Sequence, residues 1–336
     1  MYKVGMYGGS FNPPHLGHVN NIMEASCLCE KLYVVLGFSK KRDKIDHRER
    51  FKWLKQIVKD LPNTHVLELE DSDISKETYN WEKGRDDIVA KIEEEIDIVF
   101  CGDDYKGTNL FESLYPSAKV HYFSRDIVNI SSTEIRDNPY KYYEYLPKVV
   151  RPYYTKKVVI MGTESCGKST LVNSLAKIYN TTFVEELGRE VCEQAGGIDN
   201  MIPSDFPEIM FLHKVRELEA LKDANKVLFI DTEAIITMYY LRLLFDNTKE
   251  NIEPIIALGN AVSATNQDYH YIFLEPDVAW VQDGTRTYGE DEVRNSNNIM
   301  LKEMLAERNI KYETVNGNYH ERLVKVKKIV DRLISL

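Results

Sequence analysis

The sequence contains no apolar run of about 18 residues, and its N-terminus has no charged segment followed by an apolar one. Both absences argue against a membrane span and a signal peptide, so we expect a cytoplasmic protein. Basic residues are fewer than acidic ones. The sequence has 43 lysines and arginines but 53 aspartates and glutamates, which gives a formal net charge of −10. This balance argues against a broad nucleic-acid-binding surface, although it permits a single anion pocket.

Cysteine is scarce as well. Cys27, Cys29, Cys101, Cys166 and Cys192 are scattered and odd in number, which is typical of reduced thiols and not of a disulfide framework. Cys27 and Cys29 lie close together, but no second pair follows at zinc-ligand spacing, so we expect no zinc site. Repeats and low-complexity tracts are absent. The 336 residues, 43% of them hydrophobic, are long and apolar enough for two globular domains.

The strongest motif is residues 8–18, GGSFNPPHLGH, directly behind the mostly apolar run 2–7. The pattern predicts a strand, a glycine-rich turn and a helix. A helix N-terminus offers unpaired N–H groups and a partial positive charge, which favour phosphate. His15 and His18 would share one face of the first helical turn and act on that phosphate. The other candidate binding residues of this turn are Gly8, Gly9, Ser10 and Phe11.

Strands and helices alternate through the first 136 residues. Residues 32–36 and 97–101 are predicted strands, and residues 48–59 form a predicted amphipathic helix. This alternation favours a parallel sheet with helices on both faces. Because ligands of such sheets bind at the carboxyl ends of the strands, Gly102 and Asp103 should face the same crevice as the first motif.

Two features of the first half have two interpretations each. Lys40, Lys41 and Arg42 follow the second strand and either remain solvated or contact a triphosphate. Trp81 stands in a polar stretch, where its indole either stacks on a flat heteroaromatic ring or packs on the surface of its own domain.

Residues 130–136, ISSTEIR, form a second strong motif. Ser131 followed by Glu134 is a capping box, so a helix should begin here. Arg136 lies one turn further on and could hold the β- and γ-phosphates of a triphosphate. The accompanying hydroxyl and N–H donors would come from Ser131, Ser132 and Thr133.

Both motifs resemble elements of the nucleotidyltransferase superfamily. The resemblance implies that a nucleophilic phosphate attacks the α-phosphorus of ATP in line and that pyrophosphate leaves. Catalysis would then consist of positioning and charge neutralisation by His15, His18 and Arg136. Mg²⁺ is expected on the triphosphate.

Pro139 should end the short helix that begins at the second motif, and Pro147 and Pro152 mark an extended connection. We therefore expect a first domain over 1–147, a linker over 148–156 and a second domain over 157–336. The apolar stretch 157–161 predicts a strand, followed by GTESCGKST and a helix over 169–179, which is the context of a P-loop. Lys168 would bridge the β- and γ-oxygens of ATP, and Ser169 would bind Mg²⁺. The remaining candidate binding residues of this loop are Gly162, Thr163, Glu164, Ser165, Cys166, Gly167 and Thr170.

Carboxylates follow two further predicted strands of the second half. Asp231 ends a buried apolar strand, where Mg²⁺ would compensate its charge. Glu185, Glu186 and Arg189 follow the strand 181–184. Either glutamate or Asp231 could accept the proton of an attacking hydroxyl, and the sequence does not choose between them.

The C-terminal region contains a predicted loop and a predicted helix. Residues 283–294, with Arg286 and Arg294, indicate a mobile loop that closes over phosphates. Apolar residues at steps of three and four predict an amphipathic helix over 319–334.

Over essentially its whole length the chain resembles the bifunctional nicotinamide-nucleotide adenylyltransferase/ribosylnicotinamide kinase family (NadR type). The most specific carriers are residues 8–18, residues 130–136 and the continuation 137–152, with the P-loop directly behind. The resemblance implies an α/β fold of two domains, an N-terminal Rossmann-like nucleotidyltransferase and a C-terminal P-loop kinase, each with a mainly parallel sheet. It also implies that Trp81 stacks on the nicotinamide ring and that residues 280–294 form the lid.

The resemblance further implies a reaction sequence. The second domain would phosphorylate nicotinamide riboside with ATP, and the first would adenylylate the resulting nicotinamide mononucleotide to NAD. Some members of the family carry an N-terminal helix-turn-helix repressor, whereas this chain starts at the first strand, so we expect no DNA binding. Two alternatives remain, namely another acceptor such as pantetheine phosphate, or a nucleotide sensor without turnover. The sequence also permits a homo-oligomer.

Overall fold

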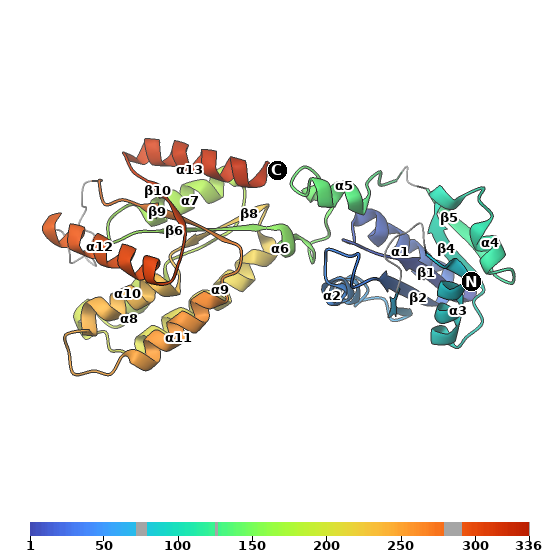
Figure 1. The fold of residues 1–336 in the computed structure, drawn as a ribbon, viewed down its shortest axis with the longest axis horizontal. Helices are drawn as coiled ribbons and strands as arrows, with labels where there is room; N and C mark the ends of the chain where they lie inside the picture. The colour runs from blue at the N-terminus through green and yellow to red at the C-terminus, as the bar shows by residue number, and fades with distance from the viewer. Residues whose placement is uncertain (72–78, 125–126, 279–290, 336) are drawn as a thin grey trace. The chain divides into compact units, whose positions relative to one another are not determined.

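The computed structural model describes residues 1–71, 79–124, 127–278 and 291–335. The chain folds into two compact units, Met1–Val150 and Arg151–Leu336. Each unit contains a five-stranded sheet in which the described strands pair in parallel (Figure 1). The predicted α/β class is therefore confirmed. Among the described residues, no helix has both the length and the apolar composition that a bilayer crossing needs.

The sheet of the first unit has the strand order β3-β2-β1-β4-β5. Its strands are β1 (Tyr2–Gly9), β2 (Cys29–Phe38), β3 (Thr64–Glu70), β4 (Ile98–Gly102) and β5 (Lys119–Phe123). Its helices are α1 (Leu16–Leu28), α2 (His47–Ile57), α3 (Trp81–Ile92), α4 (Leu110–Leu114) and α5 (Ser132–Asp137), with 3₁₀ turns η1 (Asp103–Tyr105) and η2 (Tyr143–Tyr145). The strand order reverses at β1 and β4, which is where open parallel sheets bind ligands.

Successive residues of a strand face opposite sides of a sheet, so the first unit has two cores. Tyr7 and Phe100 belong to the core on the side of α1 and α2. Met6 and Val99, their neighbours in sequence, belong to the core on the side of α3 and α4. Helices on both faces bury the sheet and leave the loops at the strand ends as its accessible part.

The second unit has the strand order β10-β9-β6-β8-β7. Its strands are β6 (Lys156–Met161), β7 (Phe183–Val184), β8 (Val227–Asp231), β9 (Tyr269–Leu274) and β10 (Tyr312–Val315). Its helices are α6 (Arg151–Tyr154), α7 (Lys168–Tyr179), α8 (Leu187–Gln194), α9 (Asp205–Asp223), α10 (Ala234–Phe245), α11 (Glu253–Ala264), α12 (Asp291–Glu307) and α13 (Tyr319–Ile334), with one 3₁₀ turn η3 (Ile198–Asn200). The predicted P-loop thus follows the central strand.

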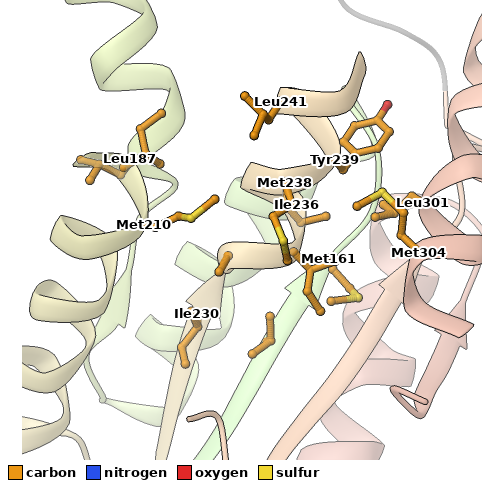
Figure 2. Packing of buried hydrophobic residues seen from close by; sticks show 14 of the residues in the cluster. Met161, Leu187, Met210, Ile230, Ile236, Met238, Tyr239, Leu241, Leu301 and Met304 are labelled. Carbon is orange, nitrogen blue, oxygen red and sulfur yellow. The ribbon is translucent and has the colours of Figure 1, made fainter. Parts of the chain in front are cut away.

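The larger core of this unit lies between the sheet and helices α8 to α12. Figure 2 shows Met161 and Ile230, from two neighbouring strands, below Met238 of α10. Met210 of α9 points into the same core from the side. On the other sheet face, α7 and α13 pack over alternate strand residues such as Ile160. The helix predicted over 319–334 is confirmed as α13, with the same bounds.

The connection between the units differs from our expectation. We predicted an extended linker over 148–156, but residues Arg151–Tyr154 form the helical turn α6, and β6 already begins at Lys156. Pro152 is compatible with this turn because the first helical residues need no N–H donor for an intrahelical bond.

Candidate active sites

The first motif spans the end of β1, the turn that follows and the start of α1. Gly8 and Gly9, predicted in the turn, are the last two residues of β1. His15 is the N-cap of α1, and its backbone N–H donates to Nδ1 of His18 at 3.2 Å. The two imidazole rings lie 3.8 Å apart between centroids, and the Phe11 ring packs against His18 at 4.9 Å. The histidines therefore share the first helical turn, as the spacing predicted, and the aromatic contact restricts the orientation of His18.

The second motif lies directly against the first. Ser132 Oγ donates to the carbonyl of Pro13 at 2.8 Å, and the guanidinium of Arg136 donates to the carbonyl of Asn12. Helix α5 starts with the predicted capping box, in which the Glu134 N–H donates to Ser131 Oγ at 3.2 Å. The structure thus brings together two segments that are more than a hundred residues apart in sequence. Arg136 also donates to the Thr133 hydroxyl at 3.0 Å.

A buried arginine that the sequence analysis missed supports the first turn. Arg50 of α2 is fully buried, donates to the carbonyl of Ser10 at 2.6 Å and pairs with Asp43 at 2.8 Å. Burial lowers the pKa of Arg50, and the attraction of Asp43 opposes this effect. No motif marks Arg50, because an arginine in a predicted amphipathic helix is expected on the solvated face.

The basic residues behind β2 are engaged by carboxylates. Arg42 pairs with Asp71 at 3.0 Å and with Asp43 at 3.4 Å, and Lys40 pairs with Glu70 at 3.0 Å. These ion pairs partly neutralise the positive charge that contact with a triphosphate would use.

Trp81 is the first residue of α3. Its ring meets Tyr79 edge-on at 4.9 Å and Phe111 at 5.9 Å between centroids. It also lines a cavity of about 390 Å³, together with Tyr79, Arg85 and Leu110 among others. The indole therefore packs on its own unit and also faces a cavity, and its stacking on a flat ring stays a prediction. Gly102 and Asp103 lie at the carboxyl end of β4, next to β1.

The P-loop has the expected context between β6 and α7. Gly162 has φ 147°, and a Cβ there would lie 2.7 Å from the carbonyl oxygen of Leu274, so only glycine fits. Lys168 is buried, and its Nζ donates to the carbonyl of Thr163 at 3.2 Å. Cys166 Sγ donates to the same carbonyl at 3.0 Å.

The charges around Lys168 balance one another. Burial lowers the pKa of Lys168, but nearby Glu186 and Asp231 more than offset this, so its pKa is raised and the ammonium stays charged. Burial also raises the pKa of Asp231, Glu186 raises it further, and Lys168 opposes both. Ser169 lies near enough to favour the charged form of Asp231. Within the described residues, however, neither Asp231 carboxylate oxygen accepts a hydrogen bond.

A second buried arginine supports the P-loop in the same way. Arg322 of α13 is 1% exposed, and its guanidinium donates to the carbonyl of Cys166. It also donates to the carbonyls of Gly317 and Glu275, both at 2.6 Å, and pairs with Asp277. The sequence predicted α13 only as an amphipathic helix, because the periodicity of a helix does not reveal which polar residue is buried.

A cavity of about 200 Å³ lies in front of the P-loop. Of the residues predicted from sequence, it is lined by Glu164, Ser165, Gly167, Lys168, Ser169, Thr170, Glu186 and Arg189. Gly162, Thr163, Cys166 and Asp231 do not belong to this lining. The cavity continues along an apolar wall that the sequence analysis missed, which includes Leu187, Cys192, Met201, Phe206, Ile236 and Tyr240.

His213 connects this wall to the end of β8. It lies on α9, lines the cavity, and its Nε2 is 3.3 Å from the carbonyl oxygen of Asp231. Burial lowers the pKa of His213, which favours the neutral ring. A single histidine inside a long helix gives no sequence signal for this contact.

The predicted arginine loop needs one correction. Arg286 lies outside the described residues. Arg294 lies in helix α12 and not in a loop, and its buried guanidinium donates to the carbonyl of Val278 at 3.0 Å. The helix reaches back to this position because residues 291–307 contain neither glycine nor proline.

Comparisons with known proteins agree with this two-unit arrangement. Residues 6–138 match a family model described as cytidylyltransferase-like, and residues 157–322 match one described as an AAA domain. The trifunctional NAD biosynthesis/regulator protein NadR of Escherichia coli (strain K12) is 29% identical over 352 residues, which covers 99% of this chain and 83% of that protein.

Two solved structures have the same fold over nearly the whole chain. A NadR protein in complex with NR has a TM-score of 0.83 at 22% identity and covers 99% of this chain and 96% of that one. A NadR protein in complex with NAD and AMP-PNP has a TM-score of 0.81 at 22% identity and covers 100% and 97%, respectively. In this one chain, a cytidylyltransferase-like unit is followed by a unit that matches an AAA domain, and the chain is similar to NadR over nearly its whole length.

Proposed function

We propose that this chain makes NAD from nicotinamide riboside in two steps. The second unit transfers the γ-phosphoryl group of ATP to the riboside and gives nicotinamide mononucleotide. The first unit transfers the adenylyl group of a second ATP to that mononucleotide and releases pyrophosphate. The full-length similarity to NadR, a protein named for NAD biosynthesis, and the NR and AMP-PNP of the solved NadR structures support this assignment.

The cavity of the second unit carries the kinase proposal. It joins a P-loop to an apolar wall with aromatic rings, so one cavity offers a place for phosphates and for a flat ring. Lys168 would contact the β- and γ-phosphates. Glu186 lines the cavity whereas Asp231 does not, which favours Glu186 as acceptor of the hydroxyl proton.

The donor set beside the P-loop fits Mg²⁺. Asp231 offers two buried carboxylate oxygens without hydrogen-bond donors in the described part of the chain, and Ser169 lies next to it. Mg²⁺ prefers oxygen ligands and usually binds through one or two protein groups plus phosphates. When bound, the ion would neutralise phosphate charge.

In the first unit, the phosphates would lie between the two motifs. His15 and His18 would donate to oxygens around the α-phosphorus, where charge develops during in-line attack. Arg136 would hold the β- and γ-phosphates, and its contact with Asn12 keeps its guanidinium beside the first turn. Trp81 would stack on the nicotinamide ring of the mononucleotide.

Product analysis by mass spectrometry tests both steps at once, with the full chain, Mg-ATP and nicotinamide riboside. Wild type should yield NAD. His18→Ala should stop at the mononucleotide, and Lys168→Ala should make NAD only from added mononucleotide.

The matched controls are His65→Ala and Lys177→Ala, which change exposed residues of the same type in the same unit. Both should behave like wild type. If wild type left the riboside and the mononucleotide unchanged, the substrate assignment would be wrong.

A further inference from the structure

Thr232 has a strained backbone at the point where the chain leaves β8. Its φ is 67°, in the left-handed region that favours glycine. Threonine branches at Cβ, and branched residues are among the least suited to this region. Thr232 is nevertheless almost fully buried, and it lines the cavity in front of the P-loop. Backbone strain of this kind persists only where the surroundings enforce it, and it collects at binding sites.

Contacts on both sides of Thr232 enforce this conformation. Before it, the Thr232 N–H donates to the carbonyl of Ile160 on the neighbouring strand at 3.1 Å. After it comes Glu233, which is buried and caps α10 by accepting from the Ile235 N–H at 3.0 Å. The other carboxylate oxygen of Glu233 accepts from Nδ2 of Asn266 at 2.9 Å. Thr232 is therefore fixed by the sheet on one side and by the engaged Glu233 side chain on the other.

Asn266 is itself held by a polar network. Its Oδ1 accepts from Nζ of Lys214 at 2.8 Å. The same ammonium donates to Glu217 at 3.0 Å and to the Tyr269 hydroxyl at 2.8 Å, so each of its three donors has a partner. Lys214 and Glu217 belong to α9, Tyr269 begins β9, and Asn266 follows α11. Three parts of the unit thus fix the amide that reaches Glu233.

Thr232 also stands between the two ends of the proposed riboside cavity. It directly follows Asp231, whose carboxylate fits Mg²⁺ at the phosphate end. It precedes Ile236, which belongs to the apolar wall. With the phosphates at the P-loop and the flat ring on that wall, the ribose lies between them. A ribose offers hydroxyl groups, and a threonine hydroxyl can donate to one or accept from it.

We propose that Asn266, through Glu233, is a positioning residue that holds Thr232 in its strained conformation, with the Thr232 hydroxyl bound to a ribose hydroxyl of the acceptor riboside. This inference rests on the proposed kinase function. The described lining of the cavity does not include Asn266, so its effect on the riboside passes through the backbone of residues 232 and 233. ATP is held by the P-loop, so loss of the Asn266 amide weakens the binding of the riboside and spares that of ATP.

Steady-state kinetics of the full chain test this split. Asn266→Ala should raise KM for nicotinamide riboside about tenfold and change KM for ATP less than about twofold. The control Asn260→Ala removes an exposed amide of the same unit, which accepts from Arg308 at 2.8 Å, and should match wild type. Thr232→Val keeps the branch but loses the hydroxyl, and should raise KM for the riboside about tenfold. Thr232→Ser keeps the hydroxyl and should stay within about threefold of wild type.

A comparison of Thr232→Gly with Thr232→Ala tests the strain without any substrate. Both variants lack the hydroxyl, but only glycine adopts a positive φ freely. The second unit of Thr232→Gly should therefore melt roughly 3 °C above that of Thr232→Ala, the reverse of the order at ordinary positions. Glycine needs no support, so adding Asn266→Ala to Thr232→Gly should change KM for the riboside less than about twofold. A purely structural role of Asn266 would not give this loss of effect.

The possible failures are distinguishable. A wild type that leaves nicotinamide riboside unphosphorylated would overturn the proposed function and the riboside contact together. An active wild type in which Asn266→Ala leaves KM for the riboside unchanged, or raises both KM values equally, would overturn the positioning role alone. A Thr232→Ala protein that melts at or above Thr232→Gly would show that residue 232 carries no strain, and this too would overturn the positioning role.

Discussion

The hydroxyl of Ser132 donates a hydrogen bond of 2.8 Å to the backbone carbonyl of Pro13, across 119 residues of chain. This contact joins the two phosphate motifs of the first unit directly. Ser132→Ala removes the donor, and the capping box of Ser131 and Glu134 should keep α5 folded. One lost hydrogen bond corresponds to about 1 kcal/mol, so kcat/KM of adenylyl transfer should fall by roughly fivefold.

The measurement is pyrophosphate release from ATP and nicotinamide mononucleotide, with kinase turnover of the same sample as internal reference. Thr108→Ala is the matched control, because its hydroxyl also donates to a backbone carbonyl, that of nearby Tyr105. An equal loss in both variants would contradict a specific role of the motif contact.

Arg322 supports the P-loop through the carbonyl of Cys166. Lysine keeps the charge but lacks the planar group that serves several acceptors at once. Arg322→Lys should therefore raise KM for ATP in the kinase reaction by about tenfold. Arg332→Lys, at an exposed ion pair of the same helix, should have no such effect. Unchanged kinetics in Arg322→Lys would show that the loop keeps its shape without this arginine.

His213 should act as a positioning residue for the end of β8. His213→Ala removes the group that faces the Asp231 carbonyl and should lower kcat of the kinase by about tenfold with a smaller change in KM. His213→Gln retains an N–H donor and should recover part of the loss. If both variants changed only KM for nicotinamide riboside, His213 would be part of the cavity wall and nothing more.

Trp81 should affect one substrate of the first unit and not the other. Trp81→Ala should raise KM for nicotinamide mononucleotide by roughly tenfold, because aromatic stacking is lost, and leave KM for ATP unchanged. The KM of Trp81→Phe for nicotinamide mononucleotide should lie between the values of wild type and Trp81→Ala. An equal rise of both KM values, together with a lower melting temperature, would show that packing against Tyr79 and Phe111 is its main role.

Glu217 should give the second unit a pH-dependent stability. Burial raises the pKa of Glu217 above its ordinary value of 4.5, and Lys214, which donates to it at 3.0 Å, only partly opposes this. The folded chain then binds its proton more tightly than the unfolded chain. The free energy of unfolding of wild type, relative to that of Glu217→Gln, should accordingly decrease as the pH rises above 4.5. The decrease should end once the pH exceeds the pKa of Glu217 in the folded chain.

Calorimetric unfolding of both proteins over a pH series measures this difference. Glu303→Gln, at an exposed site on α12, is the control, and its free energy of unfolding should depend on pH as that of wild type does. A constant difference between wild type and Glu217→Gln at all pH values would contradict the prediction.

Sequence alone predicted most of the elements that position the sites. The glycine-rich P-loop, the capping box at Ser131 and the periodicity of α13 are local signals, and the structure confirms each of them. Gly8 and Gly9, which we predicted in a turn, instead end strand β1. The strand alternation also predicted that the loops after β1 and β4 lie at the same edge of the sheet. These two strands are parallel neighbours, as that prediction requires.

The parts that could not be predicted depend on contacts between distant segments. Arg50 and Arg322 look like ordinary helix residues until packing buries them behind a phosphate loop. The apolar cavity wall consists of residue types that any core contains, such as Met201 and Phe206. The helical turn α6 was missed because proline favours extended backbone in the residue before it, unless it stands at a helix start as Pro152 does.

Every hydrophobic cluster described here draws its residues from one unit only. Each unit therefore has hydrophobic cores of its own within one chain. The consequence of joining the two units is stoichiometric. Under the proposed function, each translated molecule carries one phosphorylating and one adenylylating centre, so the two kinds of site stay at a ratio of one to one at every expression level.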